Sequence, residues 1–299
     1  IETIKSGMGQ VILVNSGNAN ACTGKAGMGD AKRTAEETSK VLNVNPKHVY
    51  VFSTGVIGVR LPMDKMISGI HTIAKEISVK GGHDAALAIM TTDRIPKEVA
   101  VEFSIGGKVC RLAGITKGAG MIAPSMTPSG KHATMLCFLT TDVAIHRDAL
   151  QSVLVDSVEH SFNSITVDND QSTNDSVVII ANGLAGNMTV TKSNKKELAI
   201  FKEAINAVCL KLAKLIAKDG EGATKLVEVV VEGTKTATEA KTIAFYVANS
   251  PLVKTAIFGN DVNWGRIMCA VGYSKVPFNP AKVSIILGGR KEGGKSYQN

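Results

Sequence analysis

One segment of the chain carries the residue types needed for self-cleavage and covalent catalysis. It runs from Lys117 to Asp142 (KGAGMIAPSMTPSGKHATMLCFLTTD), where a loop rich in Pro and Gly ends in Ala133-Thr134 and an apolar run follows. A small residue before a Thr at the start of a buried strand suits an N-terminal nucleophile. The hydroxyl attacks the preceding peptide bond, the chain breaks, and the freed α-amine, with an ordinary pKa of about 8, can act as base for that hydroxyl. On spacing alone, a structural Thr remains the alternative.

Three glycine-containing clusters predict loops that could bind an anion or a developing oxyanion. They are SGNAN at 16–20, STGVIG at 53–58 and KGAG at 117–120, and each follows an apolar, strand-like run. A loop at a strand end can present backbone N–H groups to an anion, although the glycines could also serve turn geometry alone. None of the clusters matches the GxxxxGK[ST] or GxGxxG motif, so a nucleotide-binding fold is disfavoured.

The elements expected to position these groups alternate short β-branched runs with longer amphipathic stretches. Apolar residues recur with helical spacing over 195–218, which predicts a helix packed against a sheet. The first helix is expected to begin at Asp30, a natural N-cap residue. The predicted strands are 10–15, 48–53, 99–105, 135–141, 177–181, 226–231, 255–258 and 283–287, and the predicted helices are 30–42, 63–79, 147–162, 195–218 and 236–247.

Composition restricts the class of protein. The 299 residues carry a net charge of +8, with 44% hydrophobic and 20% charged residues, which is typical of a folded globular protein rather than a disordered or fibrous one. The lysines are scattered and aromatic residues make up only 4%, so we expect no nucleic-acid partner but a positive field that attracts anionic metabolites. No apolar run approaches the roughly 20 residues that span a bilayer, so no membrane partner is expected.

The cysteines and histidines predict neither a disulfide scaffold nor a metal site. The five cysteines are far apart without a CxxC pair, and no two histidines are spaced i, i+4. A reducing compartment is the simplest interpretation, so we expect a cytoplasmic location. No signal peptide is recognised in the chain, which opens at Ile1.

Eight segments of the chain, spread from about residue 10 to about residue 288, form a highly specific combination of motifs. They are NSGNANACTG at 15–24, STGVIG at 53–58, KGAGMIAP at 117–124, ATML at 133–136, FNSITVD at 162–168, STND at 172–175, DGEGATK at 219–225 and FGNDVNWGR at 258–266. In this order they resemble the motifs of the ornithine acetyltransferase family, the glutamate N-acetyltransferases of the acetyl-cycling arginine pathway.

The resemblance implies a self-processing acetyltransferase that needs no cofactor. The chain would be cut between Ala133 and Thr134 into an α and a β chain, which would assemble as α2β2. Thr134 Oγ would take the acetyl group of N-acetylornithine, release ornithine and pass the acetyl group to glutamate in a ping-pong reaction. Whether acetyl-CoA serves as a further acetyl donor is left open, because no CoA signature is evident.

The same resemblance assigns an oxyanion hole, which must donate hydrogen bonds to the developing alkoxide. The side chain of Thr54 and the backbone N–H of Gly55 align with it. Asp168, Asn174 and Asp175 are interpreted as network residues that fix loops rather than as catalysts.

Substrate contacts are implied at Thr91, Lys117 and Glu221, in addition to Thr134. Lys117 would bind the substrate carboxylate and lower the pKa of the Thr134 α-amine, and Glu221 would pair with the amino groups of ornithine. Judged without the resemblance, the three would be a turn residue, a solvated lysine and a loop carboxylate.

The mixture of strands and helices predicts an α/β (α+β) fold, and the resemblance adds an αββα sandwich like that of N-terminal nucleophile hydrolases. We expect a catalytic domain over 1–222 and a smaller, incomplete C-terminal α/β domain over 223–299, with Trp264 as a packing anchor. The chain departs from the family pattern at 126–132, a longer loop before the cleavage site that includes His132. Such a loop would weaken the strain that drives cleavage.

Two other functions stay open at this stage. Thr134 could serve an amidase or aminopeptidase, in which water replaces glutamate as acceptor and free acetate or an amino acid is released. The chain could also be an unprocessed, non-catalytic paralogue that binds a small molecule, which predicts an uncut chain. The full set of motifs favours the acetyltransferase over both.

Overall fold

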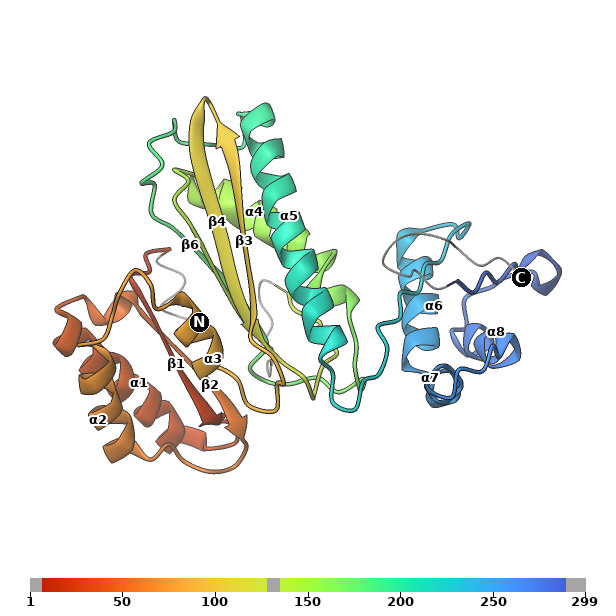
Figure 1. The fold of residues 1–299 in the computed structure, drawn as a ribbon, viewed down its shortest axis with the longest axis horizontal. Helices are drawn as coiled ribbons and strands as arrows, with labels where there is room; N and C mark the ends of the chain where they lie inside the picture. Colours follow the sequence, from red (N-terminus) through yellow and green to blue (C-terminus); the bar gives the residue numbers. More distant parts are fainter. Residues whose placement is uncertain (1–6, 128–134, 289–299) are drawn as a thin grey trace. The chain divides into compact units, whose positions relative to one another are not determined.

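The computed structural model describes residues 7–127 and 135–288, which fall into two compact units, Ile1–Gly222 and Ala223–Asn299 (Figure 1). The first unit contains both β-sheets. In chain order its elements are β1 (Val11–Asn18), α1 (Gly24–Leu42), η2 (Pro46–His48), β2 (Val49–Val56), α2 (Met63–Ile73), α3 (Gly82–Ala88), β3 (Lys97–Ile105), β4 (Lys108–Lys117), β5 (Leu136–Thr141), α4 (Arg147–Glu159), η3 (Phe162–Ser164), β6 (Ser176–Ala181) and α5 (Lys195–Lys218).

The smaller sheet pairs β1 with β2 in parallel, with α1 in the connection between them, as parallel neighbours require. Its register sets Ser16 opposite Thr54 and Gly17 opposite Gly55. Two of the three glycine clusters of the sequence therefore lie side by side where these strands end.

Helix α1 begins earlier than its sequence predicts, at Gly24 instead of after Asp30. Asp30 lies within the helix and is nearly buried. Its carboxylate accepts two hydrogen bonds, of 2.8 and 3.0 Å, from the guanidinium of Arg60. The acidic residue is therefore placed by an ion pair across the fold, and the prediction that it caps α1 is wrong.

The larger sheet has the strand order β3-β4-β5-β6, with antiparallel pairing of β3 with β4 and of β4 with β5, and parallel pairing of β5 with β6. Gly106 and Gly107, both at positive φ, form the two-residue turn between β3 and β4, the backbone conformation that favours glycine in tight hairpins. Strand β4 was not among the predicted elements. Its last residue, Lys117, lies opposite Leu136, the first residue of β5.

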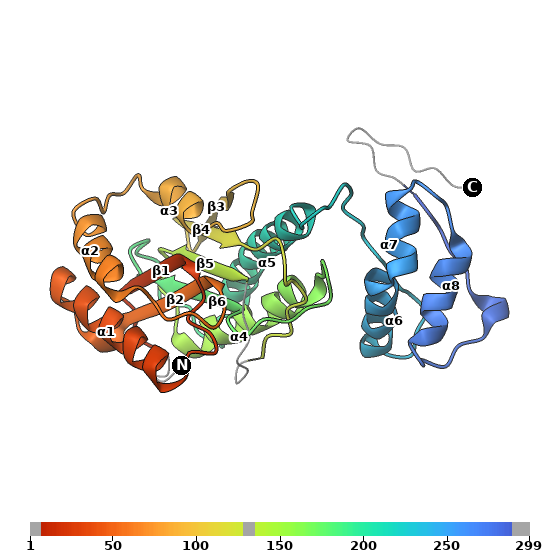
Figure 2. The same ribbon diagram turned by 90° about the horizontal axis from the view of Figure 1, so that it is seen from below.

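The two sheets face each other, and helices cover their outer sides (Figure 2). Between the sheets, Phe52 of β2 packs against Phe138 of β5 with ring centroids 5.0 Å apart, and Leu136 belongs to the same cluster. On its other face the larger sheet packs against α5, where Leu112 and Leu212 share one core. The first unit is thus a mixed α/β structure with helix, sheet, sheet and helix layers.

Within the described residues 223–288, the second unit contains helices and extended segments but no strand. The predicted strand 255–258 belongs to a helix that starts at Ser250-Pro251, a cap and first-turn pair that favours helix. The predicted strands 226–231 and 283–287 form no ladder, because a strand requires a neighbour to hydrogen-bond with. For these described residues the α/β expectation is therefore wrong. Its elements are α6 (Ala237–Asn249), α7 (Pro251–Phe258), α8 (Trp264–Tyr273) and η4 (Pro280–Lys282).

The core of the second unit is small and made by its own helices. Ile243 and Val247 of α6 pack against Val253 of α7 and Ala270 of α8. Trp264, expected to be a packing anchor, is 64% exposed at the start of α8. That expectation is wrong, because the apolar positions that α8 buries lie further along the helix.

Candidate active site

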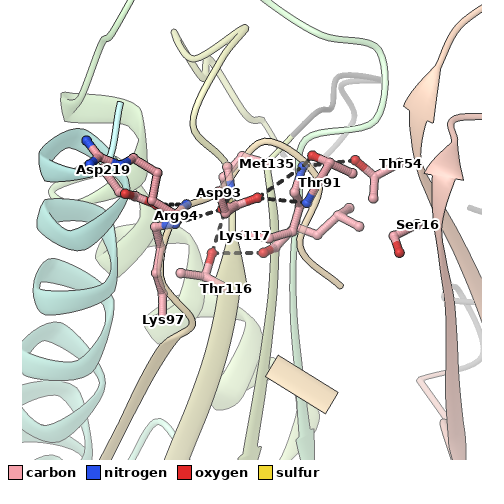
Figure 3. A network of polar contacts seen from close by, with 12 residues as sticks. Ser16, Thr54, Thr91, Asp93, Arg94, Lys97, Thr116, Lys117, Met135 and Asp219 are labelled. Carbon is pink, nitrogen blue, oxygen red and sulfur yellow. Dashed lines mark hydrogen bonds and ion pairs between the residues drawn. The ribbon is translucent and has the colours of Figure 1, made fainter. Parts of the chain in front are cut away.

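A buried lysine brings three of the predicted site residues together (Figure 3). Lys117, at the end of β4, is 1% exposed, and its Nζ donates hydrogen bonds of 2.7 Å to Thr91 Oγ1 and 3.1 Å to Thr54 Oγ1. Thr54 lies on β2, whereas Thr91 lies in the loop between α3 and β3. The contact therefore gathers groups from both sheets and from a connecting loop.

The predicted cleavage residues Ala133 and Thr134 lie outside the described residues. The next residue of the chain, Met135, is held by a hydrogen bond within the core. Met135 is fully buried, and its backbone N–H donates a 2.6 Å hydrogen bond to Asp175 Oδ1. Leu136, which follows it, lies opposite Lys117 in the sheet. The chain therefore enters β5 at the end of the sheet where β4 finishes with Lys117.

Gly55 occupies a position that only glycine can take. Its φ is +129°, and a Cβ there would overlap the backbone of Gly17 and Asn18 on the neighbouring strand. The close approach of the two strands leaves the backbone as the only part of residue 55 that can contribute to the site, consistent with a role for its N–H.

Glu221 reaches the same region from the end of α5. Its backbone N–H donates to Ala119 O at 2.9 Å. Its carboxylate lies against Gly120, so closely that a Cβ on Gly120 would be 2.6 Å from Glu221 Cδ. Glu221 is therefore packed against the loop that follows Lys117.

The electrostatic environment lowers the pKa of Lys117 and also that of Asp93, a buried carboxyl 3.8 Å from the Lys117 ammonium. Burial lowers the pKa of Lys117, with the like charge of Lys97 adding to it, while the carboxylates of Asp93, Asp175 and Glu221 partly oppose the shift. Burial also opposes ionisation of Asp93, yet hydrogen bonds from the Gly118 N–H and the Lys97 ammonium outweigh it and lower the pKa of that carboxyl.

Three charged residues that the sequence motifs did not predict lie behind Lys117. Asp93, Lys97 and Asp219 form ion pairs in which Lys97 Nζ lies 2.7 Å from Asp93 and 2.6 Å from Asp219. Asp219 occurs within the DGEGATK segment at 219–225, Asp93 stands two residues after Thr91, and Lys97 stands two residues before the strand predicted over 99–105. A charged residue at the edge of an apolar run was the available signal.

The three residues interpreted as network residues hold backbone in place. Asp168 accepts hydrogen bonds from the N–H groups of Met121 and Ile122. Asn174 Nδ2 donates 2.9 Å hydrogen bonds to Ala19 O and Ser53 O, next to Thr54. With the bond from Met135 to Asp175 already described, these contacts agree with that interpretation.

Residues 7–127 and 135–288 contain no group of three or more His, Cys, Asp or Glu side chains arranged to hold a metal ion. None of the helices in this part of the chain is long and apolar enough to cross a membrane.

Comparison with known proteins gives curated relatives that match 95% or more of the chain and a solved structure that matches 47% of it. The chain is 47% identical over 299 residues to the arginine biosynthesis bifunctional protein ArgJ of Caldanaerobacter subterraneus subsp. tengcongensis, covering 100% of this chain and 72% of that protein. It is 49% identical over 287 residues to the glutamate N-acetyltransferase of Methanocaldococcus jannaschii, covering 95% of this chain and 68% of that protein. The crystal structure of ArgJ from Bacillus halodurans is 50% identical, with a TM-score of 0.45, covering 47% of this chain and 65% of that one.

These relatives define the class of protein, an acyltransferase of arginine biosynthesis. The family model described as ArgJ family matches residues 1–296. The chain belongs to the ArgJ family.

Proposed function

We propose that this protein is a glutamate N-acetyltransferase that moves the acetyl group of N2-acetylornithine to glutamate through an acetyl ester on Thr134. The observation that carries the proposal is the Lys117 ammonium, which is hydrogen-bonded to both Thr54 and Thr91 at the place where the chain continues from Thr134 into β5. The names of the relatives support the choice of substrates.

In the first half of the reaction, Thr134 Oγ attacks the acetyl carbonyl and its proton passes to the free α-amine of Thr134. The carbonyl oxygen becomes an oxyanion that accepts hydrogen bonds from the Thr54 hydroxyl and the Gly55 N–H. The C–N bond then breaks, the leaving amine takes the proton, and ornithine departs. In the second half the neutral amine of glutamate attacks the ester carbonyl, the ester C–O bond breaks, and Thr134 Oγ takes up the proton that the amine nitrogen loses.

The hydrogen bonding around Lys117 supports the role of Thr54. An ammonium has donors only, so Thr54 Oγ1 accepts from Lys117 and keeps its own hydrogen for another acceptor. Thr91 Oγ1 likewise accepts from Lys117 and keeps its own hydrogen for another acceptor. Lys117 thereby orients two hydroxyl groups, and its positive charge favours ionised substrate carboxylates nearby.

The proposal includes the maturation of the chain. Cleavage between Ala133 and Thr134 frees the α-amine, and the resulting α and β chains form an α2β2 assembly in the cytoplasm, with 1–222 as the catalytic domain and 223–299 as the smaller domain. The helix–sheet–sheet–helix layering of the first unit is consistent with an N-terminal nucleophile fold. Acetyl-CoA as a second acetyl donor remains to be tested.

The first experiment is the intact mass of the purified protein with N-terminal sequencing of each species. We expect two chains, one of which begins Thr134-Met135-Leu136, and a Thr134→Ala variant that stays uncut. A single chain of 31.4 kDa would contradict the proposal and favour the non-catalytic paralogue.

The second experiment is an assay with N2-acetylornithine in the presence and absence of glutamate. Acetylglutamate that forms only with the processed protein supports the transferase. Free acetate formed at the same rate without glutamate would instead identify an amidase. Repeating the assay with acetyl-CoA as donor decides whether the enzyme is bifunctional.

A further inference from the structure

A chain of alternating charges lies behind Lys117, and the proposed transfer reaction does not use it. Lys97 Nζ contacts Asp93 Oδ1 at 2.7 Å and Asp219 Oδ2 at 2.6 Å, and Asp93 Oδ2 lies 3.8 Å from Lys117 Nζ (Figure 3). The side chains of Lys97 and Asp93 are 0% exposed, that of Lys117 is 1% and that of Asp219 is 6%. Two cations and two anions therefore alternate away from water.

Stability alone does not account for such a group. Removing two charges from water costs free energy that their attraction offsets only when the geometry is good, and apolar replacements are often equally stable. What a fully paired buried network does provide is a single arrangement of the groups that it holds.

Asp93 fixes the backbone beside two of the residues proposed to contact the substrate, Thr91 and Lys117. Its Oδ1 accepts a 2.7 Å hydrogen bond from the N–H of Gly118, the residue after Lys117, and its Oδ2 accepts a 3.1 Å hydrogen bond from the N–H of Thr91. One carboxylate therefore orients the backbone on both sides of the contact between the Thr91 hydroxyl and the Lys117 ammonium. Lys97 holds that carboxylate from behind.

Asp219 links the same network to the end of α5. It accepts a 2.9 Å hydrogen bond from the N–H of Arg94 in addition to its ion pair with Lys97. Glu221 follows two residues later and is tied to the loop after Lys117 by its own N–H. The network thus connects Thr91, Lys117 and Glu221, three of the proposed substrate contacts.

We propose that Asp93, held in place by Lys97 and Asp219, is a positioning residue of this site, which aligns Thr91 with Lys117 and sets the charge balance around the Lys117 ammonium. The inference rests on the proposed acetyl transfer. Asp93 would act through Thr91, Gly118 and Lys117, which it contacts, and not on the substrate itself.

The charged groups that face Lys117 give the inference a distinctive test. Burial lowers the Lys117 pKa, Asp93, Asp175 and Glu221 raise it, and Lys97 lowers it. Removing the charge of Asp93 should therefore lower this pKa further, whereas removing the charge of Lys97 should raise it. If Asp93 and Lys97 had only a structural role, substituting them would impair the protein without shifting the Lys117 pKa in opposite directions.

The experiment compares the Asp93→Asn and Lys97→Met variants with the unmodified processed protein. An NMR titration of protein labelled with ¹³C at lysine Cε follows Lys117 directly, its resonance being identified by its loss in Lys117→Arg. We expect the titration midpoint to move to lower pH in Asp93→Asn and to higher pH in Lys97→Met. The basic limb of the pH profile of kcat/KM should move in the same two directions, and kcat/KM of Asp93→Asn should fall by about 100-fold at the optimum.

Two further variants keep the test decisive. If Lys97→Met does not fold, the Lys97→Met/Asp219→Asn double variant removes one charge of each sign and should raise the midpoint in the same way. Lys108→Met changes an exposed lysine at the first position of β4, the strand that ends with Lys117. It should leave the midpoint unchanged.

Midpoints that stay fixed, or that move in the same direction in both variants, would overturn the inference. If the unmodified protein transfers no acetyl group, the proposed function fails and the positioning of substrate contacts fails with it. The NMR titration still decides whether Asp93 and Lys97 set the charge of Lys117, so the two failures are told apart.

Discussion

Lys117 and Thr54 belong to different sheets, yet the Lys117 ammonium donates a 3.1 Å hydrogen bond to the Thr54 hydroxyl. Both side chains are 1% exposed. The bond joins β4 to β2 in the region where the sheets face each other, so it depends on the packing of one sheet against the other. An ammonium buried there needs acceptors, because an unpartnered charge away from water is costly, and the two threonine hydroxyls supply them.

Replacing Lys117 with Met should abolish most of the activity while preserving the side-chain volume. Thr54 and Thr91 would lose the donor that orients their hydroxyls, and the substrate would lose a positive charge. We expect kcat/KM for acetyl transfer to fall by about 100-fold or more, comparable to the loss of an oxyanion-hole donor. The measurement is steady-state transfer from N2-acetylornithine to glutamate.

The matched control is Lys108→Met, which removes the same side chain from the exposed first position of the same strand. This variant should retain activity within about two-fold, as surface substitutions usually do. Equal activity of the two variants would show that the Lys117 ammonium has no part in the reaction.

Replacing Gly55 with Ala should destabilise the small sheet. The new Cβ would overlap the backbone of Gly17 and Asn18, and alanine is strained at a φ of +129°. We expect the free energy of unfolding to fall by about 3 kcal/mol, the sum of a strain and an overlap contribution. Urea titration of the processed protein measures it.

Gly58→Ala separates those two contributions. Gly58 also has a positive φ, of +82°, but no atom lies within 4 Å of the position of its Cβ. It should therefore show the strain alone, about 1 kcal/mol. If both variants lose the same stability, the close approach of Gly55 to Gly17 is not important.

Local pattern predicted the long, regular elements well. The helix predicted over 195–218 is α5 with the same bounds, because its apolar positions repeat over many turns. The strand predicted over 255–258 is part of α7, where the Ser-Pro start at 250–251 outweighs a short β-branched run. Strand β4 carries Lys, Arg and Gly among its apolar residues and gave no clear strand signal.

The candidate site was predictable only as far as its motifs. Resemblance to a family pointed to Thr54, Gly55, Lys117 and Glu221, and the structure brings Thr54 and Lys117 into contact. The resemblance did not predict that these two side chains would be hydrogen-bonded to each other. The ion pair between Lys97 and Asp219 joins positions 122 residues apart, and no pattern of neighbouring residues encodes a pairing that the packing of β3 against α5 creates.

The stability of the protein should depend on Asp93 at acidic pH. Burial opposes its ionisation, but hydrogen bonds from Gly118 and Lys97 outweigh it and hold its pKa below the ordinary 3.8. A carboxyl with a lower pKa in the folded than in the unfolded state stabilises the protein above the unfolded pKa, and this contribution is lost as the pH falls through the folded pKa. We expect the free energy of unfolding to decrease from about pH 5 toward about pH 3.

The Asp93→Asn variant checks the assignment, since it cannot ionise at this position. It should be less stable than the unmodified protein at neutral pH, and the difference should shrink as the pH falls. Urea titrations of both proteins over the same pH series measure this. A difference that stays constant with pH would mean that the ionised form of Asp93 contributes nothing.

Replacing Gly120 with Ala should displace the Glu221 carboxylate without altering Glu221 itself. The new Cβ would lie 2.6 Å from Glu221 Cδ, which is the far end of a flexible and exposed side chain, so the carboxylate can move aside. We expect little loss of stability, less than about 1 kcal/mol, but an increase of about 10-fold in KM for N2-acetylornithine. That increase corresponds to about 1.4 kcal/mol of lost binding.

A double-mutant cycle with Glu221→Gln tests whether the effect passes through Glu221. If it does, the Gly120→Ala/Glu221→Gln double variant should have the same KM as Glu221→Gln alone, because the displaced group no longer carries the charge. Gly69→Ala, where no atom lies near the new Cβ, should leave KM unchanged. Additive increases in the double variant would show that Gly120 affects binding by another route, and an unchanged KM in Gly120→Ala would mean that Glu221 does not bind ornithine from the conformation seen here.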